Sequence, residues 1–202
     1  LLCDLTSLKV EPVKAMLRSP AQVAGFHPMF GPTVSSLHKQ TIITTPVRCR
    51  TEILEPVLDL FRREGAVITL TTPEEHDRMM AVVQGLMHFV TLSMAETMRR
   101  IGTSPRETLA YMSPVYRIEM GLIGRLLAQD ARLYADMLQM NPYVGEVLRA
   151  CEESVHHLRE IIVSREEEAF IKTFSENAAN FGGYCEQGME ETDTLIRTVV
   201  HQ

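Results

Sequence analysis

The longest regular pattern of apolar and polar residues covers Thr72–Arg100 and predicts one long helix. Thr72 can cap its N-terminus, Pro73 suits the first helical position, and Glu75 falls three residues after the cap, where it completes a capping box. Wide apolar faces run through residues 82–92. Because such faces must be covered, we expect little of this helix to contact water.

One stripe of this helix repeats every four residues, a spacing that places side chains on one helical face. It consists of His76, Met80, Gln84 and His88, and Asp77 lies beside it. Imidazole and carboxylate groups are unusual on a helix that is mostly buried. Two interpretations stay open: the polar groups are hydrogen-bonded parts of a packed core, or they serve a functional site.

The first 72 residues alternate between short apolar runs and amphipathic runs, which predicts part of an α/β sheet. The predicted strands are Leu1–Leu5, Val23–Phe26, Gln40–Thr44 and Ala66–Thr71, and the predicted helices are Val10–Leu17 and Thr51–Glu64. The first run is typical of a buried parallel strand. Loops at the strand ends of such a sheet can carry a functional site.

After Thr72 the pattern predicts only helices. Further helix starts are predicted at Ser104, Ser113, Asp130, Asn141 and Ser164. In the last of these helices we expect the apolar side chains to point inward; they are Phe170, Ile171, Phe174, Ala178 and Phe181. The polar end, 188–202, is predicted to fray. The fold class is therefore α/β followed by all-α, with domains at 1–72 and 73–202, and the apolar surplus on the helices predicts a homodimer.

Composition narrows the class of protein. Net charge is −6 with mixed signs, which gives no electrostatic reason to expect nucleic acid or an anionic membrane as a partner. We find no apolar run near the ~20 residues of a membrane span and no signal-peptide pattern. The cysteines are far apart and lack metal-site spacing; they are Cys3, Cys49, Cys151 and Cys185. We expect reduced thiols, no metal site and a cytoplasmic location.

His27 is the strongest candidate for chemistry on spacing alone. It stands just past a predicted strand in Gly25–Pro32, a loop whose shape two glycines and two prolines fix. An α/β sheet presents catalytic groups at such a position. A histidine with a pKa near neutrality can take a proton from a hydroxyl group. The alternative is a histidine that closes the turn by a backbone hydrogen bond.

Three other residues are candidates for binding. Ser7 and Lys9 follow the first predicted strand, where either can hydrogen-bond a substrate or cofactor group. Arg117 lies in the first turn of an otherwise apolar helix, where it can bind a carboxylate through two hydrogen bonds. The alternative for Arg117 is an ion pair with Glu119 or Glu96.

Several blocks of the sequence resemble prephenate dehydrogenase, and they occur in the same order. The blocks are Asp4–Lys9, Gly25–Pro32, Glu75–Arg78, Gln84–Phe89 and Ser113–Glu119. Two more, Gly124–Asp130 and Leu133–Asp136, resemble the branch that is fused to chorismate mutase in enteric bacteria. The resemblance spans nearly the whole chain. It implies oxidative decarboxylation of prephenate to 4-hydroxyphenylpyruvate in tyrosine biosynthesis, with NAD or NADP as cofactor, and a Rossmann domain followed by a helical dimerisation domain.

The resemblance also implies roles for single residues. His27 matches the histidine that takes the proton of the C4 hydroxyl as hydride leaves, and Ser7 matches the serine that orients this histidine, beside the cofactor. Arg117 matches an arginine that binds a substrate carboxylate. Positions that border the substrate pocket are matched by His76, Gln84, Lys9 and His88. His88 matches a histidine linked with sensitivity to tyrosine, which makes tyrosine a candidate inhibitor.

The sequence departs from the family pattern at one point: no Gly-x-Gly-x-x-Gly follows any predicted strand. We therefore expect the N-terminal half of the dinucleotide fold to be absent and these 202 residues to be inactive alone. Two alternatives remain open, a non-catalytic module for dimerisation and tyrosine sensing, and an arogenate dehydrogenase. Dehydrogenases of the 6-phosphogluconate and ketopantoate types are disfavoured, because they use a lysine base on the helical domain.

Overall fold

The computed structural model describes residues 1–31 and 33–200. Its packing forms two units. The first combines Leu1–Gly85 with Arg132–Val147, and the second combines Leu86–Ala131 with Leu148–Gln202. The sheet unit thus includes the start of the long helical segment and a stretch from the later helices, whereas sequence periodicity places a domain boundary after residue 72.

The first unit is built on a sheet with the strand order β1-β2-β3-β4. The strands are β1 (Leu2–Asp4), β2 (Val23–Pro28), β3 (Thr41–Arg48) and β4 (Val67–Leu70), and all four were predicted. β1 pairs with β2 and β3 with β4 in parallel, whereas β2 and β3 are antiparallel. The two parallel pairs are joined through helices, and the antiparallel pair through a loop, as chain direction requires.

β1 is not the buried strand that its apolar sequence predicts. Leu1 and Leu2 are 47% and 37% exposed. The reason is position: β1 is at the edge of the sheet among the described strands, and β2 is its one hydrogen-bonded neighbour there. Apolar composition alone does not distinguish an edge strand from a central one.

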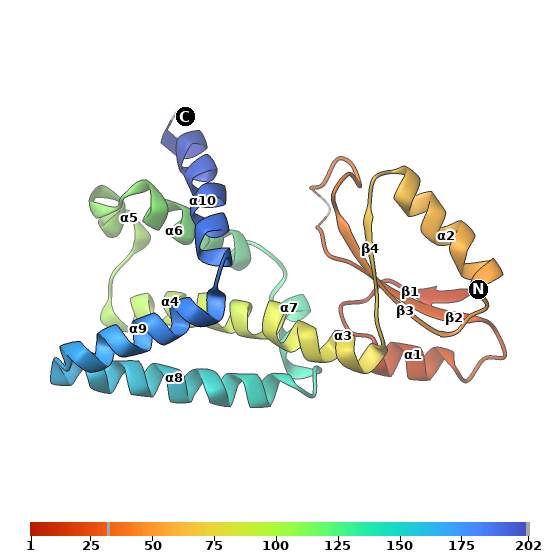
Figure 1. Ribbon diagram of the computed structural model, residues 1–202, viewed down its shortest axis with the longest axis horizontal. Coiled ribbons are helices and arrows are strands. Elements are labelled where there is room, and N and C mark those ends of the chain that lie inside the picture. The colour runs from red at the N-terminus through yellow and green to blue at the C-terminus, as the bar shows by residue number, and fades with distance from the viewer. Residues whose placement is uncertain (32, 201–202) are drawn as a thin grey trace. The chain divides into compact units, whose positions relative to one another are not determined.

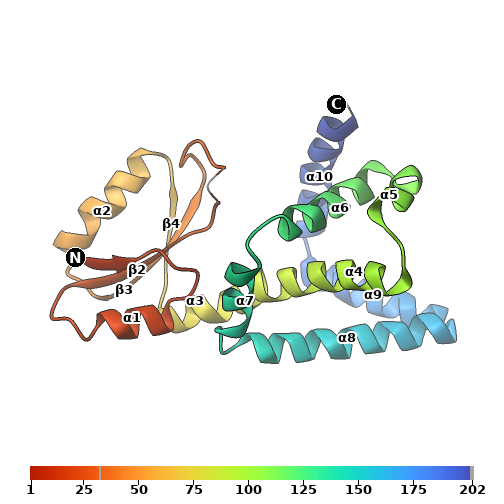
Figure 2. The same ribbon diagram turned by 180° about the vertical axis from the view of Figure 1, so that it is seen from behind.

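Helices cover the two faces of this sheet. α1 (Val10–Met16) and α2 (Thr51–Arg63) lie on opposite sides (Figures 1 and 2). Under α2, Leu54 and Leu58 pack with Ala24, Phe26 and Ile42 of the sheet, which forms the apolar core. Because side chains alternate along a strand, the neighbours Gly25 and His27 face the other side. That side, towards α1, is the polar one.

The long helical segment runs from Pro73 to Ile101, as predicted, but its middle is π-helical. α3 (Pro73–Met80) begins with the expected Thr72 cap, but a π-helical turn (Ala81–Leu86) separates it from α4 (Met87–Ile101). Gly85 lies in that turn, and a Cβ there would come within 2.8 Å of Val144 Cγ2. Turns of this kind often accompany functional sites. The sequence gives no local signal for one.

Burial of this segment also differs from the prediction. Only 17% of its most apolar 18-residue window is buried, and by length and composition Pro73–Ile101 could also cross a membrane. The first turns of this segment are not suited to a membrane, because His76 and Asp77 are buried there and make polar contacts within the sheet unit. Several large apolar side chains of α4 are exposed, among them Met87, Val90 and Met94.

The second unit is helical. α4 packs on α6 (Pro114–Leu127), and α6 packs on α10 (Tyr184–Val200). α8 (Val144–Ser164) runs beside α4 in both views (Figures 1 and 2) and shares an apolar groove with it. The predicted cap at Ser104 is present as a complete capping box with Glu107. The remaining helices are α5 (Pro105–Thr108), α7 (Ala131–Gln139), which belongs almost wholly to the sheet unit, and α9 (Glu167–Phe181).

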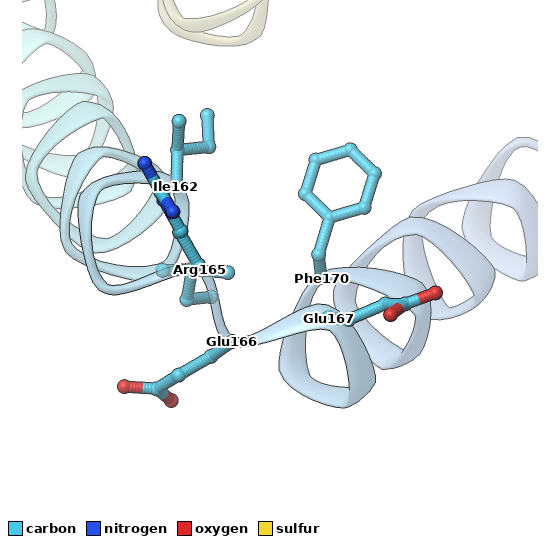
Figure 3. Close-up of a pocket in the computed structure, with 6 residues that line it drawn as sticks. Ile162, Arg165, Glu166, Glu167 and Phe170 are labelled. Atoms are coloured by element: carbon cyan, nitrogen blue, oxygen red, sulfur yellow. The ribbon is translucent and has the colours of Figure 1, made fainter.

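Two predictions for the C-terminal region are wrong. The segment predicted to fray is helical as far as Val200, because it continues α10, which contacts α6. The aromatic side chains of α9 do not point into a core: Phe174 is 67% exposed. Figure 3 shows Phe170 at an open hollow by the turn between α8 and α9, near Ile162 and Arg165. These faces are apolar but uncovered.

Candidate functional site

The candidate site is a chain of buried polar groups on the α1 side of the sheet. β2 places His27 there, with only 4% of the residue exposed. Its Nδ1 lies 2.9 Å from Nε2 of His76 on α3. The two imidazoles come from positions 49 residues apart in sequence. His27 is therefore held by a side chain, not by the backbone hydrogen bond that we considered as an alternative.

Asp77 continues the chain beyond His76. Nδ1 of His76 lies 2.7 Å from Oδ1 of Asp77, and both residues are 1% exposed. The order Asp77–His76–His27 places a carboxylate behind two imidazoles in series. Sequence reasoning singled out both histidines but gave Asp77 no role, because adjacent residues on a helix point in directions about 100° apart. The flexible χ angles of His76 let its ring turn back to its neighbour.

Asp77 also caps α1. Its Oδ1 accepts a hydrogen bond from the backbone amide of Lys9 at 2.8 Å, and its Oδ2 accepts one from the amide of Val10 at 3.0 Å. Burial raises the pKa of Asp77, but the hydrogen bonds from His76 and these two amides outweigh burial, so the pKa is lowered. Asp77 is thus a fixed anion that accepts hydrogen bonds from three donors.

Asn141 holds the same part of α3 from another element. Its Nδ2 donates to the backbone carbonyl of Asp77 at 2.7 Å, and its Oδ1 accepts from the amide of Tyr143 at 3.0 Å. Asn141 is 4% exposed and lies between α7 and α8. In the sequence, Asn141-Pro142 reads only as a helix start. A contact over 64 residues leaves no local signal that could reveal its second role.

Lys9 occupies the centre of this layer. Its side chain is fully buried, and its ammonium forms an ion pair with Asp4 and lies 3.4 Å from Oγ1 of Thr6. Burial lowers the pKa of Lys9, against the opposing effect of Asp4. The lysine stem passes over Gly25, where a Cβ would lie 2.8 Å from Lys9 Cδ. Its ammonium is thus committed to protein groups, and the substrate contact that the resemblance implies stays a prediction.

His27 is neutral in this environment. Burial, with the neighbouring His76 and Lys9, lowers the pKa of His27 from 6.5 to about 4. We expected a pKa near neutrality from the sequence, and the difference arises because no solvent and no direct anion faces the ring. A neutral imidazole is the form that can accept a proton.

Four other candidate residues were named from the sequence. Ser7 is half-buried after β1 and has no hydrogen bond to His27, and Gln84 is half-buried in the π-helical turn. His88 and Arg117 belong to the second unit. Burial lowers the pKa of His88. The roles that the resemblance implies for these four residues stay predictions.

Arg117 does not form the ion pairs that were its structural alternative. Glu96 is bound instead by Arg99 and Arg100, at 2.7 Å each. Within the described residues no ion pair joins Arg117 to Glu119, and Arg117 is exposed at the start of α6. Its guanidinium is therefore available to an external anion. No group of three histidine, cysteine or acidic residues in the described chain could hold a metal ion.

Comparisons with known proteins agree on one family. Residues 72–176 match the family described as "Prephenate dehydrogenase, dimerization domain". The chain is 34% identical over 201 residues to the "Probable arogenate/prephenate dehydrogenase" of Methanocaldococcus jannaschii, covering 97% of this chain and 45% of that protein. It is also 34% identical to the "T-protein" of Haemophilus influenzae, with coverage of 98% and 52%. The chain thus spans about half the length of the curated relatives it matches.

Solved structures agree on the fold. A prephenate dehydrogenase from Aquifex aeolicus, crystallised with hydroxyphenyl propionate and NAD+, has a TM-score of 0.71 at 23% identity. The match covers 88% of this chain and 65% of that one. A Synechocystis arogenate dehydrogenase also gives 0.71, at 16% identity. The α/β part followed by helices is therefore the fold of these enzymes, and the chain belongs to the prephenate dehydrogenase family, whose dimerization domain it contains.

Proposed function

We propose that the natural protein containing these residues is a prephenate dehydrogenase, which converts prephenate and NAD+ or NADP+ to 4-hydroxyphenylpyruvate, CO2 and the reduced cofactor. The observation that supports it most is His27, a neutral imidazole at the end of β2, held by His76 and backed by Asp77. The family membership of residues 72–176 points to the same reaction.

The protein has little covalent chemistry to perform in this reaction. The hydride at C4 of prephenate leaves with its electron pair, while His27 takes the proton of the C4 hydroxyl. The bond from the ring to its carboxylate then breaks, and its electrons complete the aromatic ring as CO2 departs. Because aromatisation drives the loss of CO2, the protein needs to orient the C4–H bond, accept one proton and hold the carboxylates.

The dinucleotide supplies the hydride acceptor when it is bound. We propose that Ser7 lies at its nicotinamide end. Ser7 is half-buried after β1, where its hydroxyl can bond a ring substituent of the cofactor or the substrate. The sequence contains no Gly-x-Gly-x-x-Gly turn for the pyrophosphate. We therefore propose that pyrophosphate binding involves a part of the protein outside these residues.

Arg117 is the proposed anchor for a substrate carboxylate. Its guanidinium is exposed and has no ion-pair partner among the described residues, and a planar fork suits a carboxylate. Gln84, Lys9, His76 and His88 remain proposed neighbours of the substrate. We further propose a homodimer formed by the helical part, a cytoplasmic location, and inhibition by tyrosine, which shares the phenol ring of the product. Uncovered apolar surface on α4 and α9 supports the dimer.

The test is oxidation of prephenate by the natural protein that contains residues 1–202, followed by absorbance of the reduced cofactor and by detection of 4-hydroxyphenylpyruvate. The expected result is turnover with prephenate and NAD+ or NADP+. Arogenate in place of prephenate distinguishes the second candidate, which the name of the Methanocaldococcus jannaschii relative includes. A folded dimer that binds tyrosine but reduces neither cofactor with either substrate would instead indicate a non-catalytic sensing module.

A further inference from the structure

We propose that His76 and Asp77 are positioning residues that fix the tautomer of His27 and take over its charge during the reaction. The inference rests on the proposed function for its catalytic consequence, but its structural part stands on contacts in the sheet unit alone. Asp77, His76 and His27 form one line of hydrogen bonds, each residue at most 4% exposed. Only a few distributions of protons are compatible with this series of hydrogen bonds.

The proton positions follow from the acceptor at the end. An ionised carboxylate can only accept hydrogen bonds, and Asp77 receives the amides of Lys9 and Val10 besides His76. His76 must therefore carry its proton on Nδ1, the atom that lies 2.7 Å from Asp77. The proposal assigns His76 a neutral ring. Its Nε2 is then an acceptor, so His27 must donate from Nδ1 across 2.9 Å.

These proton positions determine which nitrogen of His27 can accept a proton. Since Nδ1 of His27 carries the proton, Nε2 holds the free electron pair. When Nε2 accepts a proton from a hydroxyl group, the Nδ1 proton of His27 can pass to Nε2 of His76. The positive charge then rests on His76, in direct contact with the Asp77 carboxylate. Atoms and charges balance, because one proton enters at His27 and one proton moves between the rings.

The surroundings favour that transfer. Burial, His76 and Lys9 each lower the pKa of His27, against smaller opposing effects of Asp4 and Asp77. The hydrogen-bond partner of His27 is the ring of His76 and not an anion. A charge that stayed on His27 would lack a hydrogen-bonded anion. A charge on His76 would have one. The acceptor is also rigid, because α1 fixes both carboxylate oxygens of Asp77 and Asn141 fixes its carbonyl.

The first arm of the test is ¹⁵N NMR of the histidine rings in the natural protein, labelled at histidine and free of substrate, at pH 7. The expected spectrum shows His27 and His76 each protonated at Nδ1 and unprotonated at Nε2. A His27 ring protonated at Nε2 would overturn the proposal. This readout needs no turnover, so it decides the tautomer even if the protein does not oxidise prephenate.

The second arm is kinetic and uses two variants. His76→Gln leaves the Asp77 cap on α1 intact but offers no ring to receive charge, and Asp77→Asn removes the anion. Both should lower kcat about 100-fold, the lower end of what a general base contributes, with little change in KM. Asp59→Asn, a matched change in an exposed ion pair with Arg62 on α2, should leave kcat unchanged.

The outcomes separate the proposal from a structural role and from the proposed function. If Asp77→Asn fails to fold for loss of the cap, His76→Gln and the wild-type spectrum still decide. Folded His76→Gln with wild-type kcat would overturn the transfer of charge. If the wild-type protein shows the expected tautomers but no oxidation of prephenate, the proposed function fails and the positioning of His27 stands.

Discussion

At the scale of residues, one layer of buried polar side chains contains the proposed base. His27, His76, Asp77 and Lys9 are each at most 4% exposed, and each is hydrogen-bonded or ion-paired within the layer. Buried polar groups are costly unless they are paired. The pairing is nearly complete, although Oδ1 of Asp4 has no partner among the described residues. Such a layer specifies its own geometry, which a proton-transfer site needs.

The low pKa of His27 predicts a loss of stability in acid. Its pKa is about 4 in the folded chain against 6.5 for the ordinary group. Between these pH values the unfolded chain binds more protons than the folded chain. The contribution of His27 to the free energy of unfolding is therefore complete above about pH 6.5. It falls by up to about 3 kcal/mol as the pH drops towards 4. Urea unfolding at pH 7 and pH 5 measures it.

His27→Gln is the control, because it removes the titrating ring. Protonation of Asp77 also destabilises the fold in acid, but only as the pH falls through the lowered pKa of Asp77. The difference between wild type and His27→Gln therefore isolates His27. An equal pH dependence in both proteins would contradict the neutral, buried state of this ring.

At the scale of elements, local signals were sufficient for most of the fold. Caps such as Thr72 and Ser104 act within one turn, so helix starts could be predicted from the sequence. Two features could not be predicted, because they depend on contacts between distant segments. One is the π-helical turn, where Gly85 packs against Val144, and the other is the hydrogen bond from Asn141 to the Asp77 carbonyl. For the same reason the candidate site was found in part, with His27 and His76 named but not joined.

The packing of α1 on β2 gives a prediction at this scale. At Gly25 a Cβ would lie 2.6 Å from Thr45 Oγ1, 2.8 Å from Lys9 Cδ and 3.0 Å from Asp4 Oδ1. Gly25→Ala should therefore push Lys9 and the start of α1 off the strand and destabilise the fold by about 1–3 kcal/mol. Thermal or urea unfolding measures the change.

Gly31→Ala, after the end of β2, is the control, because no atom lies within 4 Å of a Cβ at Gly31. It should change stability by less than about 0.5 kcal/mol. If Gly25→Ala were as stable as this control, close packing of Lys9 over the strand would be wrong.

At the scale of the whole molecule, the helices carry large exposed apolar side chains. Met87 on α4 is 61% exposed and Phe174 on α9 is 67% exposed. Large exposed apolar patches mark interaction sites in soluble proteins, and residues 72–176 match a family described as a dimerization domain. A second copy of the chain is the partner that these two observations support.

We therefore predict a dimer at micromolar concentration in sedimentation velocity. Met87→Glu should shift the equilibrium towards monomer, since a charge would be buried in the interface without a partner. Glu152→Gln on the exposed part of α8 serves as the control and should stay dimeric. A wild-type monomer at micromolar concentration would leave the apolar faces without their proposed cover.

The role of His27 as the base is tested most directly by kcat of His27→Asn in the natural protein, with prephenate and NAD+. Asparagine keeps polarity near the ring position but cannot accept the hydroxyl proton. Because loss of a general base typically costs 10²–10⁴-fold, kcat should fall within that range while KM changes little. Turnover at the wild-type rate by a folded His27→Asn protein would contradict the assignment of His27 as the base.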